Sequence, residues 1–191
     1  MGGKLSSAAI STRQPQTRQP ETTHSEVAAE SWFALQTRYR FEKKVEAQLS
    51  GKGMEVFLPL RKESRDWSDR KKVLMVPLFP GYAFVRSSRS VALRLLVLQT
   101  AGVMGFVSFS GTAATVPEKQ IEDLRLLLAQ EVPFSLYPFV KEGERVRIRG
   151  GALDGVQGLL TQREKDKLVI SIDSIQRSLA IEIHGYELER I

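Results

Sequence analysis

The hydrophobic pattern changes near residue 140, and that change constrains the fold more than any other feature of the sequence. Beyond it, β-branched residues alternate with polar ones and turn residues recur. The pattern predicts short strands at residues 145–149, 158–161, 167–172 and 179–183, with a fifth at 188–191. Strands at this spacing in about 50 residues are typical of a small closed β-barrel.

Residues 31–132 combine strand and helix periods. Apolar runs predict strands at residues 32–37, 54–60, 82–86 and 105–109, and apolar residues three or four positions apart predict helices at 39–49, 90–99 and beyond 117. Thr115 to Glu118 fit a capping box at the start of the last helix. Extended arms around the charged residues 61–72 predict a protruding hairpin. We therefore expect an α+β domain with a largely antiparallel sheet and flanking helices.

Two further segments differ from both regions. Residues 1–30 are rich in Ser, Thr, Gln and Pro and contain almost no large apolar side chains, so they are predicted to be a disordered tail. The tail lacks the apolar core of a signal peptide, so we expect a cytoplasmic protein. Residues 133–139 contain two prolines and are predicted to link the N-terminal domain, residues 31–132, to the barrel domain, residues 140–191.

The net charge of +6 is concentrated in one region. Residues 31–138 carry sixteen basic and ten acidic side chains, whereas residues 1–30 carry three of each and residues 139–191 carry nine of each. A polyanionic partner is therefore expected to bind the middle region and not the C-terminal one.

The composition excludes several classes of site. The chain has no cysteine and only two histidines, so disulfides, thiol catalysis and thiolate zinc sites are excluded, and no cofactor or metal is expected. No stretch of ~18 consecutive apolar residues is present, which excludes a membrane-spanning helix. Glu55, Asp66 and Asp69 are the carboxylates that lie near one another outside predicted helices, and no base or nucleophile accompanies them. We expect no enzymatic activity.

Two sets of motifs resemble known families. Residues 140–158 resemble the KOW motif, whose glycines stand here at Gly143, Gly150, Gly151, Gly155 and Gly158. Glycine permits a tight reversal or a close backbone approach at such places. Four N-terminal motifs in order, at residues 32–37, 41–42, 77–85 and 102–107, resemble the N-terminal domain of the NusG family. The combined resemblance covers residues 31–191.

NusG-family proteins are transcription elongation factors, and the resemblance implies the same function here. It implies that the N-terminal domain binds the clamp helices of RNA polymerase and holds the enzyme in a processive state. The residues at the matching positions are Trp32, Phe79, Tyr82 and Phe84. The helix at 90–99 would lie near the opposite jaw of the polymerase.

The resemblance also implies contacts with nucleic acid. Arg38, Arg40, Lys43 and Lys44 correspond to the region that approaches the non-template strand in the transcription bubble. Basic side chains beside an aromatic such as Tyr39 suit single-stranded DNA. At the hairpin tip, Arg70 and Lys71 are candidates for contact with upstream duplex DNA.

The KOW domain of the family recruits a small-subunit ribosomal protein or the termination factor Rho. Leu153, in the loop formed by Gly150, Gly151, Gly155 and Gly158, stands where many members carry an aromatic residue, which argues against Rho. The hairpin and the tail favour a specialised antiterminator of the RfaH type. The glycines and β-branched runs oppose helix formation, so we expect a permanent barrel. We also expect a monomer.

Each assignment has an alternative. Phe79, Tyr82 and Phe84 are equally explained as core residues, with Trp32 as a core anchor at the edge of the patch, and the basic residues as solvated side chains. The alternative function is a ribosome-associated, RNA-binding structural protein. That reading needs a basic KOW domain, whereas the charges of residues 139–191 cancel.

Overall fold

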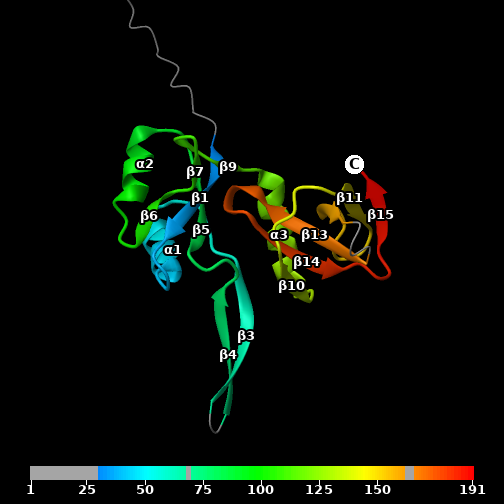
Figure 1. Ribbon diagram of the computed structural model, residues 1–191. Helices are drawn as coiled ribbons and strands as arrows, with labels where there is room; N and C mark the ends of the chain where they lie inside the picture. The colour runs from blue at the N-terminus through cyan, green and yellow to red at the C-terminus, as the bar shows by residue number, and fades with distance from the viewer. Residues whose placement is uncertain (1–29, 68–69, 162–165) are drawn as a thin grey trace, which may run out of the picture.

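The computed structural model describes residues 30–67, 70–161 and 166–191. It contains two larger antiparallel sheets, a projecting hairpin and three α-helices (Figure 1). Helices α1 (Glu42–Gly51) and α2 (Val91–Leu98) lie beside the first sheet, and α3 (Glu118–Ala129) lies between the first sheet and the second.

The first sheet is five-stranded and antiparallel, with the order β2-β5-β1-β6 and β9 paired to β1. Its strands are β1 (Ser31–Thr37), β2 (Val56–Phe57), β5 (Tyr82–Ser87), β6 (Val103–Phe106) and β9 (Thr115–Val116). The short strands β7 (Ser108–Phe109) and β8 (Thr112–Ala113) form a separate pair. The predicted α+β class is confirmed.

Strand β1 explains why residues 32–35 form an uninterrupted apolar run. Phe33 and Leu35 belong to the core with α1 and α2, which includes Val45 and Val97. Trp32 and Ala34 belong to the opposite core. Because successive side chains of a strand point to opposite faces, a strand covered on both faces must be apolar at every position.

The predicted capping box is wrong. Thr115 lies in β9, and α3 begins after Pro117, whose side chain makes no capping hydrogen bond. The pairing of Trp32 with Val116 holds this segment in the sheet. The Glu118 carboxylate accepts a hydrogen bond from Trp32 Nε1 at 3.1 Å, so it bonds a tertiary partner.

The hairpin consists of β3 (Leu60–Trp67) and β4 (Arg70–Pro77), paired in continuous register from Leu60↔Pro77 to Trp67↔Arg70. It projects from the body as the sequence predicts (Figure 1). The strand predicted at residues 54–60 is divided: β2 pairs with β5, and Leu60 already belongs to the hairpin. Side-chain contacts between the hairpin and the body include Lys43 Nζ to the Met75 carbonyl at 2.7 Å and Lys62 to Glu131 at 2.5 Å.

The second sheet is six-stranded and antiparallel, with the order β10-β14-β13-β12-β11-β15. The strands are β10 (Phe134–Tyr137), β11 (Glu144–Arg149), β12 (Gln157–Leu160), β13 (Lys167–Ile172), β14 (Arg177–Glu182) and β15 (Glu187–Arg190), with a 3-10 turn, η1, at Asp173–Ile175. Five of these strands match the sequence-based prediction for an all-β C-terminal region. The sixth corrects it: the segment expected to be a linker contains β10, which pairs with β14 along its whole length.

Candidate functional site

The four aromatic residues of the predicted polymerase patch lie on or beside one face of the first sheet. Trp32 and Phe84 are fully buried on the face that packs against α3, and Phe84 stacks on Phe57 with ring centroids 6.1 Å apart. Phe79, in the turn before β5, is 2% exposed. Tyr82 is half-buried at the edge of the same cluster. In this conformation the core interpretation therefore applies to Trp32, Phe79 and Phe84.

An ionic group covers this aromatic face. The Arg125 guanidinium on α3 lies 5.0 Å from the Trp32 ring centroid and 5.2 Å from that of Phe57, within the range of a cation–π contact. It donates to Glu55 at 2.9 Å. The hydrogen bond from Arg125 lowers the pKa of the Glu55 carboxyl below its ordinary value. Arg125 is 70 positions from Glu55 in the chain and farther still from Trp32, so no local sequence pattern could have revealed the contacts.

The turn that carries Phe79 is held by a buried carboxylate. Glu42 is 2% exposed, and its Oε1 accepts a hydrogen bond from Gly81 N at 2.7 Å. The Gly81 carbonyl in turn accepts from Thr37 N at 2.8 Å. The sequence places Glu42 in a family motif but does not reveal this role, because a glutamate in the first turn of a helix ordinarily faces solvent. Its bond to Gly81 fixes the turn directly beside the end of β1.

The basic residues after β1 form an exposed surface, which we call the basic loop: Arg38, Tyr39, Arg40, Lys43 and Lys44. Tyr39 is 69% exposed, and the Arg40 guanidinium carbon lies 5.4 Å from its ring centroid. Of the other cations, Lys44 Nζ lies 5.5 Å from the Phe41 ring centroid, and Lys43 Nζ donates to the Met75 carbonyl at 2.7 Å. An aromatic face with adjacent cations can stack a base and bind its phosphates. Arg70 and Lys71 lie on the β4 backbone near the hairpin tip, and their side chains are outside the described part of the structure.

The KOW-like loop between β11 and β12 is a compact turn. Gly150 N donates to Asp154 Oδ1 at 2.6 Å, and Gly155 N donates to the Ile148 carbonyl at 2.8 Å. Leu153 is fully buried in the core of the second sheet. The loop therefore folds the large apolar side chain of Leu153 inward in this conformation.

Gly158 and Gly151 complete the loop region. A Cβ at Gly158 would lie 2.7 Å from the Val169 carbonyl oxygen, so β12 and β13 require glycine there. Gly151 adopts a φ of 70° within the reversal. Both glycines are therefore required by the backbone conformation and present no side chain to a partner.

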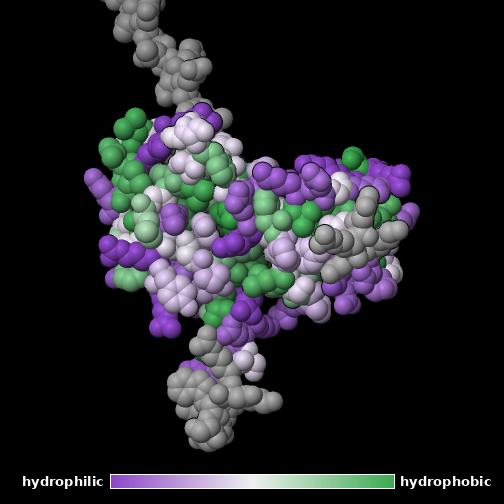
Figure 2. Space-filling model, in the orientation of Figure 1, coloured by the Kyte–Doolittle hydropathy of each residue, from purple (hydrophilic) through white to green (hydrophobic). Residues whose placement is uncertain are grey.

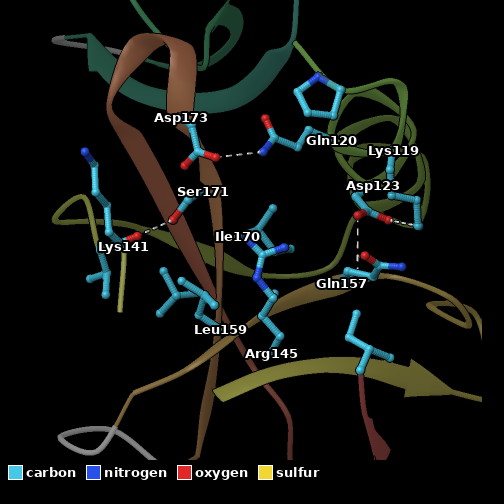
Figure 3. A pocket seen from close by; sticks show the side chains of 15 residues that line it. Lys119, Gln120, Asp123, Lys141, Arg145, Gln157, Leu159, Ile170, Ser171 and Asp173 are labelled. Atoms are coloured by element: carbon cyan, nitrogen blue, oxygen red, sulfur yellow. Dashed lines mark hydrogen bonds and ion pairs between the residues drawn. The ribbon is translucent and has the colours of Figure 1, made fainter. Parts of the chain in front are cut away.

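The second sheet contacts α3 through polar groups as well as apolar ones (Figure 3). Asp123 is 3% exposed, is paired with Lys119 and accepts from Gln157 N at 3.3 Å. Burial raises the pKa of the Asp123 carboxyl, and the hydrogen bond from Lys119 opposes that rise. Gln120 Nε2 donates to Asp173 at 3.4 Å across the same junction. A cavity of about 540 Å³ lies between these groups.

Helix α2 carries an exposed apolar stripe. Val91, Leu95 and Leu98, spaced as residues of one helix face, are 73%, 50% and 44% exposed. Figure 2 shows apolar side chains gathered over this helix. The stripe lies at the position where the family resemblance implied a second polymerase contact.

Two classes of site have no candidate in the described residues. Within residues 30–67, 70–161 and 166–191, no cluster of three or more His, Asp or Glu side chains is arranged to hold a metal ion. In the same residues, no helix is both long and apolar enough to cross a membrane.

Comparison with known proteins identifies the family. The profile of the family described as "Transcription termination factor nusG" matches residues 30–125, half of the chain. The chain is similar to the transcription termination/antitermination protein NusG of Borreliella burgdorferi, at 26% identity over 184 residues, covering 84% of this chain and 98% of the relative. It is also similar to NusG of Lactococcus lactis, at 27% identity over 177 residues, covering 85% and 94%.

Among solved structures, "Domain interaction in Thermotoga maritima NusG" matches with a TM-score of 0.48 and 23% identity, covering 85% of this chain and 98% of that one. The chain belongs to the NusG family of transcription termination and antitermination factors, which are not enzymes.

Proposed function

We propose that this protein is a transcription elongation and antitermination factor that binds the clamp helices of RNA polymerase and keeps the enzyme processive. One observation carries the proposal. The hydrogen bond from Thr37 N to the Gly81 carbonyl places the turn that carries Phe79 and Tyr82 directly beside the start of the basic loop at Arg38. A protein partner and a nucleic acid can therefore be bound by one continuous surface.

Tyr82 is the polymerase-contacting side chain that this conformation leaves accessible. Phe79 reaches a partner only when the residues that cover it move away. Trp32 and Phe84 support the turn from within the core. A factor that binds the clamp in its closed position shifts the population of polymerase away from loosened, paused states, without catalysis.

The basic loop supplies the proposed contact with the non-template strand. Arg38, Arg40, Lys43 and Lys44 would neutralise phosphates, and Tyr39 would stack on a base. Arg70 and Lys71 would extend this contact to upstream duplex DNA. The apolar stripe of α2 would contact a second part of the polymerase.

The second sheet is the proposed recruiting module, for a small-subunit ribosomal protein or Rho. The projecting hairpin supports a specialised antiterminator over a housekeeping role. We further propose that the protein acts as a monomer in the cytoplasm and that the second sheet remains a sheet throughout.

The test is binding of the full-length protein to purified RNA polymerase, with Tyr82→Ala as the variant and Tyr186→Ala, another half-buried tyrosine, as the matched control. Loss of affinity of about tenfold or more in Tyr82→Ala, with Tyr186→Ala close to wild type, supports the proposal. Equal affinities of the two variants for RNA polymerase would refute the proposed contact between this turn and the polymerase.

A further inference from the structure

Strand β10 is the peripheral strand of the second sheet. It pairs with β14 on one side, and no described strand pairs with its other edge. Ser135 and Leu136 are exposed, Leu136 by 59%. Strand β14, in contrast, is buried at 2% exposure or less from Ser178 to Ile181. The sheet is therefore built around β14, and β10 covers its edge.

The pairing of β10 also sets how far the second sheet can move. Only residues 130–133 join the end of α3 to β10, and four residues span at most about 14 Å. If β10 left β14, the connection would be residues 130–143, and these fourteen residues span up to about 50 Å. The pairing of β10 with β14 therefore determines whether the connection after α3 is four or fourteen residues long.

A hollow beside β10 is larger than the Ser135 side chain that borders it. About 560 Å³ of space is lined by Ser135 and its cross-strand partner Ala180, together with Lys167, His184 and Tyr186. Directly opposite residues of an antiparallel pair lie on the same face, so the small Ser135 side chain borders this space. A larger side chain at this position of the strand would fill more of it.

We propose that the β14 edge is a strand-binding site and that β10 can be exchanged for an extended segment of a partner protein. The resident strand defines the chemistry of the replacement: apolar side chains at the positions of Phe134 and Leu136, and a side chain larger than serine between them. Main-chain hydrogen bonds supply the affinity and the alternate side chains the specificity, as in other cases of strand addition. Exchange lengthens the connection between α3 and the rest of the second sheet. This inference rests on the second sheet and its connection to α3, and it is independent of the polymerase contact.

Because the sequence contains no cysteine, an introduced pair of cysteines can form a reversible disulfide between β10 and β14. Ser135 and Ala180 are cross-strand partners, and both are close in size to cysteine. Paired residues of antiparallel strands have Cα atoms about 4.5–5.5 Å apart, within the range of a disulfide. In full-length Ser135→Cys/Ala180→Cys, oxidation holds β10 on β14 and reduction releases it.

The probe is a labelled peptide with the sequence of residues 132–139. Because the tethered β10 competes at an effective concentration of the order of millimolar, we expect weak binding to wild type. The reduced double variant should bind the peptide at least tenfold more tightly than the oxidised form, and a peptide carrying Leu136→Pro should bind neither. A peptide carrying Ser135→Tyr should bind the reduced form more tightly than the parent peptide. Equal binding by the oxidised and reduced forms would overturn the proposal.

A second variant does not depend on disulfide formation. One of two adjacent residues in a strand donates to its neighbour, so Ser135→Pro/Leu136→Pro removes that bond whichever residue makes it. This protein, if its circular dichroism retains the signal of the folded sheet, should bind the peptide more tightly than wild type. A folded variant that binds no better than wild type would also refute strand exchange. If the variant unfolds, the disulfide comparison decides.

Discussion

Replacing Gly155 and Gly51 by alanine makes the same chemical change in two conformations, and the structure predicts opposite effects. Gly155 has a φ of +85°, and its N–H is held by the Ile148 carbonyl at 2.8 Å. Gly51 ends α1 and has no atom within 4 Å of the position of an added Cβ. At neither site does a Cβ meet a neighbour, so only the backbone conformation distinguishes them.

The magnitude follows from that conformation. A left-handed residue with a Cβ costs about 1–2 kcal/mol, and the hydrogen bond to Ile148 prevents the backbone from relaxing. Gly155→Ala should therefore lower the free energy of unfolding by about 1–2 kcal/mol, which lowers Tm by roughly 5–15 °C for a unit of this size. Gly51→Ala gains helix propensity and loses unfolded-state entropy, so its effect should be neutral or stabilising by up to ~1 kcal/mol.

The assay is thermal and denaturant unfolding of the full-length variants, followed by circular dichroism. Gly155→Val should be less stable than Gly155→Ala, because a β-branched residue tolerates positive φ less well. The reasoning would be refuted if Gly155→Ala unfolded within about 2 °C of wild type, or if Gly51→Ala were destabilised as much.

Three further predictions concern other parts of the molecule. Leu153→Ala should lower the free energy of unfolding by about 2–5 kcal/mol, because the side chain is fully buried; a loss below 1 kcal/mol in denaturant unfolding would contradict its core role. Because the pKa of Asp123 is raised, its contribution to the free energy of unfolding is complete below the ordinary value of 3.8 and is lost as pH rises through the raised pKa. Asp123→Asn should remove this pH dependence of stability, as measured by unfolding between pH 3.5 and 7, and an unchanged profile would contradict the prediction. Arg40→Ala/Lys44→Ala should reduce the slope of log affinity for single-stranded DNA against log salt by about 1.4, whereas Lys141→Ala/Arg145→Ala on the second sheet should leave it unchanged; equal slopes for both pairs would contradict the role of the basic loop.

Some predictions failed where tertiary contacts outweighed local signals. Thr115 to Glu118 fit a capping box, yet Thr115 pairs with Phe33 in the sheet and Glu118 binds Trp32. Two prolines around residues 134–137 suggested a linker, yet β10 is an edge strand, where proline at either end removes no inner hydrogen bond. In both cases the competing partner is remote in the chain and invisible to a local reading.

The site shows the same division between local and remote information. The basic loop could be read from Arg38, Arg40, Lys43 and Lys44, because adjacent charges in a short segment remain adjacent after folding. The covering of the aromatic face by Arg125 and Glu55 could not, because α3 reaches that face only after the sheet has formed.

The sequence by itself determined the three helices, most of the longer strands, the family and the regions of excess charge, since these depend on spacing and composition over a few residues. It also determined which loop requires glycine. Only the tertiary structure decided that Phe79 and Leu153 are buried, that Asp123 and Gln120 join α3 to the second sheet, and that residues 134–137 complete that sheet. The physical reason is that burial and pairing depend on which surfaces meet, and the surfaces that meet here come from segments far apart in the chain.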